Sequence, residues 1–287
     1  MTPQFDWQSH LRGAIRAACV LEATARKPGN VHPGAAFEDV RYEDFVRSAD
    51  VTAPVLAETP RLGVGRAIRE AVSVTQRAVG RNTNLGIILL IAPLAAVPEE
   101  VALVEGIKSV LDGLTVEDAQ FCFEAIRMAH PGGLGDAGEQ DVREAPTVTL
   151  REAMRLATDR DRIAEQYVNG FREVLSLGVP FLPGQSWGED WEQAVIRLHL
   201  QLMADFPDTL IARKCGADVA MESAERAKRV IDAGWPESES GRNEIEQLDQ
   251  WLRADEHRRN PGTTADLVAA ILFAALRDRR FPLPPLE

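Results

Sequence analysis

Cysteine is scarce in this sequence, and clustered metal-binding patterns are absent. Of the 287 residues only three are cysteines, Cys19, Cys122 and Cys215, and no two of them form a C-x-x-C pair. Disulfide frameworks and zinc knuckles need such clustering, so neither is expected, and we predict a reducing, cytoplasmic setting. The sequence also lacks H-E-x-x-H, P-loop and Ser/His/Asp-type motifs, which argues against metalloproteases, Walker-type ATPases and triad hydrolases.

Long apolar runs and excess positive charge are missing as well. The longest apolar stretch, Leu85 to Val97, is interrupted by Pro93 and is too short to span a bilayer. The first residues, Met1 to Trp7, do not form a basic region followed by an apolar run, so no signal peptide is expected. The formal net charge of −12 argues against nucleic acid or an anionic membrane surface as the main partner, because both are polyanions.

Strand-like alternation of β-branched residues is also lacking, whereas helical periodicity recurs along the whole chain. Apolar residues at three-to-four spacing predict helices over residues 7–25, 42–57, 63–79, 149–177, 186–206, 215–233, 243–257 and 263–277. A helix near residues 85–97 is apolar all round, which is typical of the centre of a bundle. We therefore predict an all-α fold, with residues 1–287 forming one multi-helix domain.

The stretch from Lys27 to Gly34 reads Lys-Pro-Gly-Asn-Val-His-Pro-Gly and ends the first predicted helix. Its prolines fix their own φ, and Gly29 permits a turn that other residues resist. A stiff loop that holds Lys27, Asn30 and His32 suits a bound anion. A well-made helix stop is an equally good interpretation.

A second loop, residues 133–138, matches the G-x-G-x-x-G spelling of a dinucleotide-binding fingerprint. That motif requires a preceding strand, and here a helix precedes it, so we reject a nucleotide-cofactor fold of this type. Three carboxylates follow one another closely in the loop, at Asp136, Glu139 and Asp141. They fit a Mg²⁺ site or, alternatively, a solvated acidic turn.

Two further segments carry charged or capping residues. Asp208 and Thr209 lie shortly before Arg213 and Lys214, an arrangement that fits a phosphate or metal position. It fits equally well an aspartate that stabilises a helix dipole. Thr263 and Asp266 have the spacing of a capping box, which explains both residues without a ligand.

Taken in order, these loops resemble the triphosphoribosyl-dephospho-CoA synthase family over nearly the whole chain. The resemblance is carried by Lys27-Pro28-Gly29, by Asp39 and Phe45 with Ser48, by Asn82-Thr83 with Gly86, by Asp208-Thr209, and by the segment Pro261 to Leu267. It implies an all-helical transferase that joins C1 of the ATP ribose to the 2′-hydroxyl of 3′-dephospho-CoA and releases adenine. The partners would then be small-molecule nucleotides and coenzyme precursors, with no nucleic acid and no membrane; the oligomeric state is left open, a homo-oligomer included.

Residue type, together with position in the motifs that carry the resemblance, suggests roles for individual residues. Asp208 and Asp136 are the candidates for stabilising the ribose cation and for the base. The metal ligands would be Asp136, Asp141 and Asp208, which hold Mg²⁺ on the triphosphate. The residues expected to bind ATP are Lys27, Gly29, Asn30, His32, Asn82, Thr83, Asn84, Gly86, Thr209, Arg213 and Lys214.

The sequence departs from the family pattern at two places. Asn84-Leu85 stands where the family usually has His-Lys, and Asn30-Val31-His32 stands where Leu-Val-Asp is more usual. Divergent relatives of this kind are associated with the biosynthesis of one-carbon-carrier coenzymes, so a different acceptor is an alternative. A non-catalytic nucleotide-binding or scaffold protein is a further alternative, because the two replacements remove charge from the proposed donor site.

Overall fold

The computed structural model describes residues 6–131, 140–182 and 190–279. Within these ranges the chain forms fifteen α-helices and one π-helix. The described residues contain no strand, and their only β-type pairing is an isolated bridge between His32 and Ala35. The all-α prediction is therefore confirmed, whereas the single-domain organisation stays a prediction.

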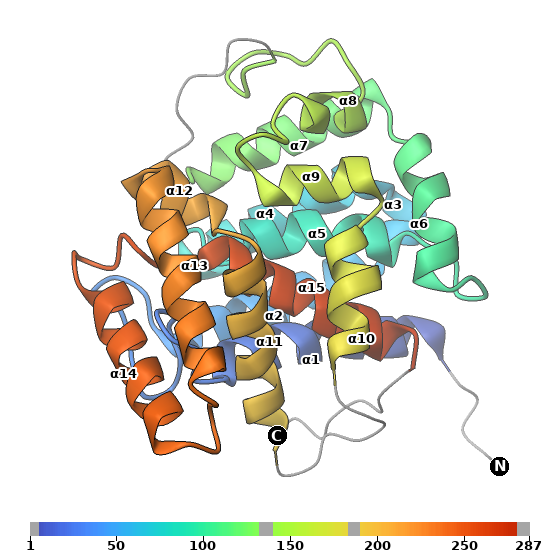
Figure 1. Ribbon diagram of the computed structural model, residues 1–287. Helices are drawn as coiled ribbons and strands as arrows, with labels where there is room; N and C mark the ends of the chain where they lie inside the picture. Colours follow the sequence, from blue (N-terminus) through green and yellow to red (C-terminus); the bar gives the residue numbers. More distant parts are fainter. Residues whose placement is uncertain (1–5, 132–139, 183–189, 280–287) are drawn as a thin grey trace, which may run out of the picture.

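The first half of the chain supplies the helices that surround the most apolar segment. They are α1 (Trp7–Thr24), α2 (Tyr42–Ala57), α3 (Thr59–Leu62), α4 (Val64–Val79), α5 (Leu85–Ala95), α6 (Leu103–Asp112) and α7 (Val116–Ala129). Every residue of α5 is buried, because a helix that is apolar on all sides must pack on all sides. Figure 1 shows α5 beside α15 (Gly262–Arg277) near the middle of the molecule.

The second half contains α8 (Leu150–Arg155), α9 (Arg162–Asn169), the π-helix η1 (Glu173–Gly178), α10 (Val179–Phe181), α11 (Trp191–Asp205), α12 (Thr209–Cys215), α13 (Ala217–Asp232) and α14 (Glu239–Arg253). The prediction of one helix over residues 149–177 is wrong. Asp161 starts a new helix there, because its side chain accepts hydrogen bonds from the backbone N–H groups of Ile163 and Ala164. Gly170, in the left-handed conformation, then ends α9.

The buried apolar residues form two clusters that share α11. One face of α11, with Val195, Leu198 and Leu202, packs into the main core around α1, α5 and α15. Its other face, which includes Leu200 and Met203, packs into a smaller core with α12, α13 and α14. The amphipathic helices of the second half are thereby fixed against the first half.

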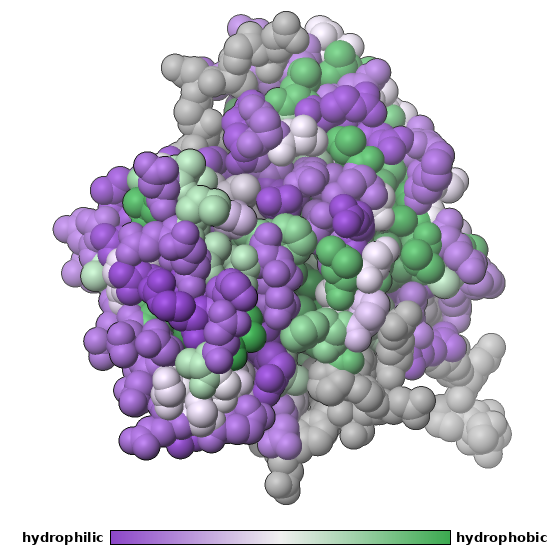
Figure 2. Space-filling view, in the orientation of Figure 1, coloured by the Kyte–Doolittle hydropathy of each residue, from purple (hydrophilic) through white to green (hydrophobic). Residues whose placement is uncertain are grey.

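The outer faces of the smaller core are hydrophilic. On the side shown in Figure 2, hydrophilic residues dominate over α13 and α14, while apolar residues gather over η1 and α10, where Leu177 and Phe181 are exposed. No helix among the described residues has the length and apolar content that a membrane crossing requires.

Candidate active site

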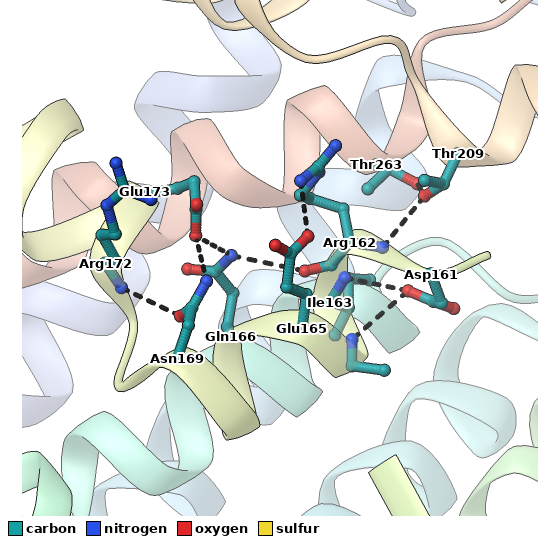
Figure 3. Close-up of polar contacts among 11 residues, drawn as sticks. Asp161, Arg162, Ile163, Glu165, Gln166, Asn169, Arg172, Glu173, Thr209 and Thr263 are labelled. Atoms are coloured by element: carbon teal, nitrogen blue, oxygen red, sulfur yellow. Dashed lines mark hydrogen bonds and ion pairs between the residues drawn. The ribbon is translucent and has the colours of Figure 1, made fainter. Parts of the chain in front are cut away.

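The first turns of four helices, α5, α9, α12 and α15, meet at one place. Figure 3 shows Arg162 of α9 beside Thr209 of α12 and Thr263 of α15. The Arg162 backbone N–H donates to Thr209 Oγ1 (3.3 Å), and the Thr209 and Thr263 hydroxyls are 3.1 Å apart. The first turn of α5 joins this group through Gly86, which contacts α15. Because the N-terminus of a helix carries partial positive charge, this convergence attracts negatively charged groups.

Asp208 joins two of these helix ends. Its Oδ1 accepts hydrogen bonds from the backbone N–H groups of Leu210 (2.8 Å) and Ile211 (3.0 Å), which caps α12. Its Oδ2 accepts from the backbone N–H and the hydroxyl of Thr264, both at 2.8 Å, which anchors the first turn of α15. Burial raises the pKa of the Asp208 carboxyl, while these four hydrogen bonds oppose the shift. Asp208 was predicted to be catalytic and to bind metal, and the structure engages both of its oxygens in holding helix ends.

Asp161 and Arg213 form an ion pair at the edge of the same region. Asp161 caps α9, and its Oδ2 accepts a hydrogen bond from Arg213 Nη1 at 2.6 Å. The Nε atoms of Arg213 and of Arg162 are buried and have no hydrogen-bond partner among the described residues. Each guanidinium group also pairs with a carboxylate, Arg162 with Glu165 and Arg213 with Asp161, so both cations are held in place at the helix ends.

Asp266, on α15, lies within this group of acids. Burial raises the pKa of its carboxyl well above the ordinary value, and the negative charges of Glu22, Asp208 and Asp161 raise it further, while Arg213 opposes the shift. Among the described residues no hydrogen-bond partner of the Asp266 carboxyl is found. The side chain is half-buried, so the group can still meet a ligand. Such a carboxyl favours its protonated form and is a candidate general acid.

Gly86 lets Asp266 approach the first turn of α5. A Cβ atom at Gly86 would lie 2.0 Å from Asp266 Oδ2 and 2.7 Å from Ile163 Cδ1 of α9. No side chain fits there, which explains the glycine. Gly86 was predicted to bind ATP, and the structure places it against the candidate acid.

Sequence reasoning did not select Asp266 or Asp161. The predicted capping box of Thr263 with Asp266 is wrong, because α15 has Pro261 at its N-cap position and no side-chain capping bond. Asp266 could have been selected because it lies in the segment Pro261 to Leu267, which carries part of the family resemblance. Asp161 was hidden because its segment was interpreted as the middle of one long helix.

Lys27 is fully buried and paired with Glu22 at the end of α1. Its ammonium lies 3.0 Å from Glu22 Oε1 and donates to the backbone carbonyls of Glu22 and of Ala25 (3.3 Å for the latter). The pair therefore brings compensated charge into the core near Asp266. Lys27 was predicted to bind phosphate; here its ammonium is held by its own chain, and direct phosphate contact stays a prediction.

The loop that follows Lys27 is fastened to α14 and to the start of α15. Gly29 has φ of +76°, and its N–H donates to Asp249 Oδ1 at 2.7 Å. The Asn30 amide donates to Asn260 Oδ1 (2.8 Å), but the Asn30 Oδ1 atom is buried and has no hydrogen-bond partner in the described part of the chain. Burial lowers the pKa of His32, and the positive charge of Arg253 lowers it further. These contacts tie the loop to its neighbours, and its stiffness stays a prediction.

The predicted Asn82–Asn84 segment forms the entry to α5. Asn82 Oδ1 accepts a hydrogen bond from the Leu85 backbone N–H at 3.1 Å, and the Thr83 hydroxyl lies 2.6 Å from that of Ser48. Asn84 is buried, and its Oδ1 accepts a hydrogen bond from the Thr75 hydroxyl at 3.2 Å. These contacts fix the loop beside Gly86.

Of the three predicted metal ligands, the structure describes Asp141 and Asp208 but not Asp136. Asp136 lies outside the described residues, and Asp141 forms an ion pair with Arg143 at 2.6 Å. The described ranges hold no group of three or more His, Cys, Asp or Glu side chains arranged to hold a metal ion. Lys214 of α12 is half-buried, and its backbone carbonyl accepts a hydrogen bond from Arg258 at 2.6 Å. The magnesium site stays a prediction.

An apolar cavity of about 130 Å³ adjoins the Asp161–Arg213 pair. Its walls come from α5, α7, α8 and α9, and include Leu89, Phe123, Ile126, Met154 and Ile163. Its charged rim is formed by Asp141, Arg160, Asp161 and Arg213. A second, larger hollow of about 270 Å³ lies beside the Lys27–Gly34 loop and is lined by Arg26, Pro28, His32, Ile245, Glu246, Asp249 and Gln250.

The sequence matches a family model over nearly its whole length. The ATP:dephospho-CoA triphosphoribosyl transferase family matches residues 8–284. Two similar curated proteins both carry the name "Probable 2-(5''-triphosphoribosyl)-3'-dephosphocoenzyme-A synthase". The protein of Pseudomonas syringae pv. tomato is 34% identical over 110 residues, which cover 38% of this chain and 37% of that protein. The protein of Pseudomonas savastanoi pv. phaseolicola is 30% identical over 164 residues, which cover 50% and 56%.

A solved structure has the same arrangement of helices. It is described as the "Crystal structure of putative triphosphoribosyl-dephospho-coA synthase from Archaeoglobus fulgidus". It has a TM-score of 0.64 and 27% sequence identity, and the match covers 80% of this chain and 97% of that one. The two curated relatives, in contrast, are matched over only 37% and 56% of their own length.

Proposed function

The chain belongs to the ATP:dephospho-CoA triphosphoribosyl transferase family, and on this premise we propose that it is a triphosphoribosyl transferase. It joins C1′ of the ATP ribose to the 2′-hydroxyl of 3′-dephospho-CoA, or of a related coenzyme precursor, and releases adenine. The three cysteines are free, which supports a cytoplasmic enzyme.

The observation that carries this proposal is the group of acids around Asp266. Glu22, Asp161, Asp208 and Asp266 come from four separate parts of the chain, and the first three raise the pKa of the fourth. Breaking the bond between C1′ and the purine nitrogen builds positive charge on the ribose. Negative groups held beside that carbon in a partly buried site stabilise the transition state.

Asp266 supplies the proton for the leaving group. As the bond from C1′ to the purine nitrogen breaks, its electron pair remains on the purine, and the protonated Asp266 carboxyl donates its proton to the purine ring. The acceptor hydroxyl forms the new bond to C1′ and loses its own proton to a second carboxylate. For that base we retain Asp136, because the Asp208 oxygens already accept four hydrogen bonds.

The triphosphate binds at the positive ends of the helices. Arg162 and Arg213 are about four-fifths buried and incompletely hydrogen-bonded, so they are the nearest cations for phosphate oxygens. Mg²⁺ commonly binds through one or two carboxylates together with substrate phosphates, so Asp136 and Asp141 suffice as protein ligands. The ion would neutralise part of the triphosphate charge in this acidic protein.

Incubation with Mg-ATP and 3′-dephospho-CoA, followed by chromatography of the bases and nucleotides, tests the proposal. Free adenine is expected in step with loss of ATP. Formation of ADP or AMP without adenine would show that the nucleotide is used as a phosphoryl or adenylyl donor and would refute triphosphoribosyl transfer.

A different acceptor is the second candidate function, and the entry to α5 favours it. Leu85 and Asn84 are both buried, and Asn84 is bonded to Thr75, so this dipeptide places no charge at the site. A site without the usual His-Lys charges would hold its substrates differently. Adenine release from ATP that depends on another coenzyme precursor, and not on 3′-dephospho-CoA, would favour this candidate.

A further inference from the structure

The apolar cavity between α5, α7, α8 and α9 has the character of a binding pocket for a flat ring. Phe123, Ile126 and Met154 line it, and charged groups are confined to its rim at Asp141, Arg160, Asp161 and Arg213. Small-molecule pockets commonly combine apolar walls with a few polar groups at one side. Leu156, which also lines the cavity, is 41% exposed, so part of the apolar wall is accessible from solvent.

One residue of the cavity wall, Ile163, links the cavity to the candidate acid through Gly86. Ile163 forms part of the cavity wall, and its Cδ1 packs against the first turn of α5 at Gly86. The carboxyl of Asp266 contacts the same point of Gly86 from α15. A ring that fills the cavity would therefore have one edge near Asp266 and the Asp161–Arg213 pair.

We infer that this cavity binds an adenine base. Its apolar walls fit the faces of the purine, and the aspartates and arginines of the rim can pair with the exocyclic amine and the ring nitrogens. The inference rests on the proposed function for its chemical consequence, because adenine held there is beside the acid that protonates it. The base could belong to ATP or to 3′-dephospho-CoA, since both contain adenine.

Calorimetric titration of the full chain with adenine, inorganic triphosphate, ATP and 3′-dephospho-CoA tests the inference. Ala153, on α8, is half-buried and lines the cavity, so Ala153→Leu fills the space without changing charge. Adenine affinity is expected to fall at least tenfold in this variant, while triphosphate affinity stays unchanged. Ala194→Leu, at a half-buried position of α11 outside the cavity, is the matched control and should bind adenine like the wild type.

The two nucleotides identify the source of the base. If the donor's base occupies the cavity, Ala153→Leu weakens ATP and not 3′-dephospho-CoA; the reverse pattern assigns the cavity to the acceptor's base. Unchanged affinity for both nucleotides and adenine, an equal loss of adenine and triphosphate affinity, or no adenine binding by the wild type would each overturn the inference.

A second variant covers the case in which Ala153→Leu does not fold. Leu156→Ser removes apolar surface at an exposed position, where folding tolerates the change, and should weaken adenine several-fold. Adenine release from ATP is measured separately. Adenine binding without release would leave the cavity assigned and refute the transferase, whereas release at the wild-type rate by Ala153→Leu would refute the cavity assignment alone.

Discussion

Asp266 shows how a single carboxyl group is adapted by its surroundings. Its pKa is raised first by burial and then by three neighbouring acids, and only Arg213 acts in the opposite direction. The nearby Glu22 carboxylate, in contrast, forms an ion pair with Lys27. Without such a cation among the described residues, the raised pKa of Asp266 favours its protonated form, which general acid catalysis requires.

Replacing Asp266 by asparagine should lower adenine release about 10²- to 10⁴-fold, the usual contribution of a general acid. The wild-type rate should fall as the pH rises through the raised pKa of Asp266, because the proton is then lost, and the variant should lack this fall. A pH series of initial rates checks both. Asp218→Asn, the same change at an exposed position of α13, is the control and should leave the rate unchanged.

The same substitution should stabilise the fold at high pH. The pKa of Asp266 in the folded protein lies above its ordinary value of 3.8, so the folded state binds more protons than the unfolded state between these two values. Stability contributed by this group is thus present below pH 3.8 and is lost as the pH rises through the folded-state pKa. Thermal denaturation at pH 8 should show Asp266→Asn melting a few degrees above the wild type.

At lower pH this difference should disappear. Near pH 3 both states of the wild type are protonated at Asp266, so the two proteins should melt together. A variant that is less stable than the wild type at pH 8 would mean that Asp266 forms a stabilising ionised contact, and the acid assignment would fail.

Gly86→Ala should destabilise the protein by about 1–3 kcal/mol, because the new methyl group overlaps Asp266 and Ile163. Gly113→Ala is the control: its nearest neighbour outside the adjacent residues would be 3.4 Å from the new Cβ, and its φ is −86°. That change should be neutral or slightly stabilising. Urea denaturation of both variants measures the difference, and equal free energies of unfolding would contradict the close approach of α15 to α5.

At the scale of the helices, Asp208 connects elements that no local sequence pattern would join. Its first oxygen caps α12, which an aspartate just before a helix predicts. Its second oxygen holds Thr264, 56 residues away, at the start of α15. The ends of both helices therefore depend on one buried side chain.

Asp208→Ala should cost about 1–4 kcal/mol, since a capping side chain contributes about 0.5–2 kcal/mol and this one serves two helices. Thr149→Ala removes the single cap of α8 and should cost about 1 kcal/mol. Asp208→Asn, which retains an acceptor for α12, should lie between them. If Asp208→Ala costs no more than Thr149→Ala, the second connection contributes nothing; if Asp208→Asn folds normally but loses all activity, Asp208 has a chemical role as well.

Helix positions could be predicted from the sequence wherever the apolar period was long and uninterrupted. The predicted segments 7–25, 42–57 and 263–277 agree closely with α1, α2 and α15. The segment 149–177 failed, because three short helical pieces in succession preserve an amphipathic period while Asp161 and Gly170 divide it. Periodicity reports which side of a helix is buried and does not by itself report where the helix stops.

At the scale of the whole molecule, the site arises from distant segments that pack around α5 and α15. Most of the loops at this site could be predicted from the sequence, including the entry to α5 and the Asp208-Thr209 pair. The sequence could not show that Lys27 is buried beside Glu22, or that Asp266 has no hydrogen-bond partner in the part of the chain that the structure describes, because both depend on how helices pack. Asp136 and the magnesium site stay predictions.

Binding of a nucleotide analogue is the most direct test of this account. A crystal structure of the protein with a non-hydrolysable ATP analogue should show the purine ring within hydrogen-bonding reach of the Asp266 carboxyl, with the triphosphate toward Arg162 and Arg213. An analogue bound instead in the hollow beside His32 and Asp249, away from Asp266, would contradict the placement of the chemistry at the meeting point of the four helices.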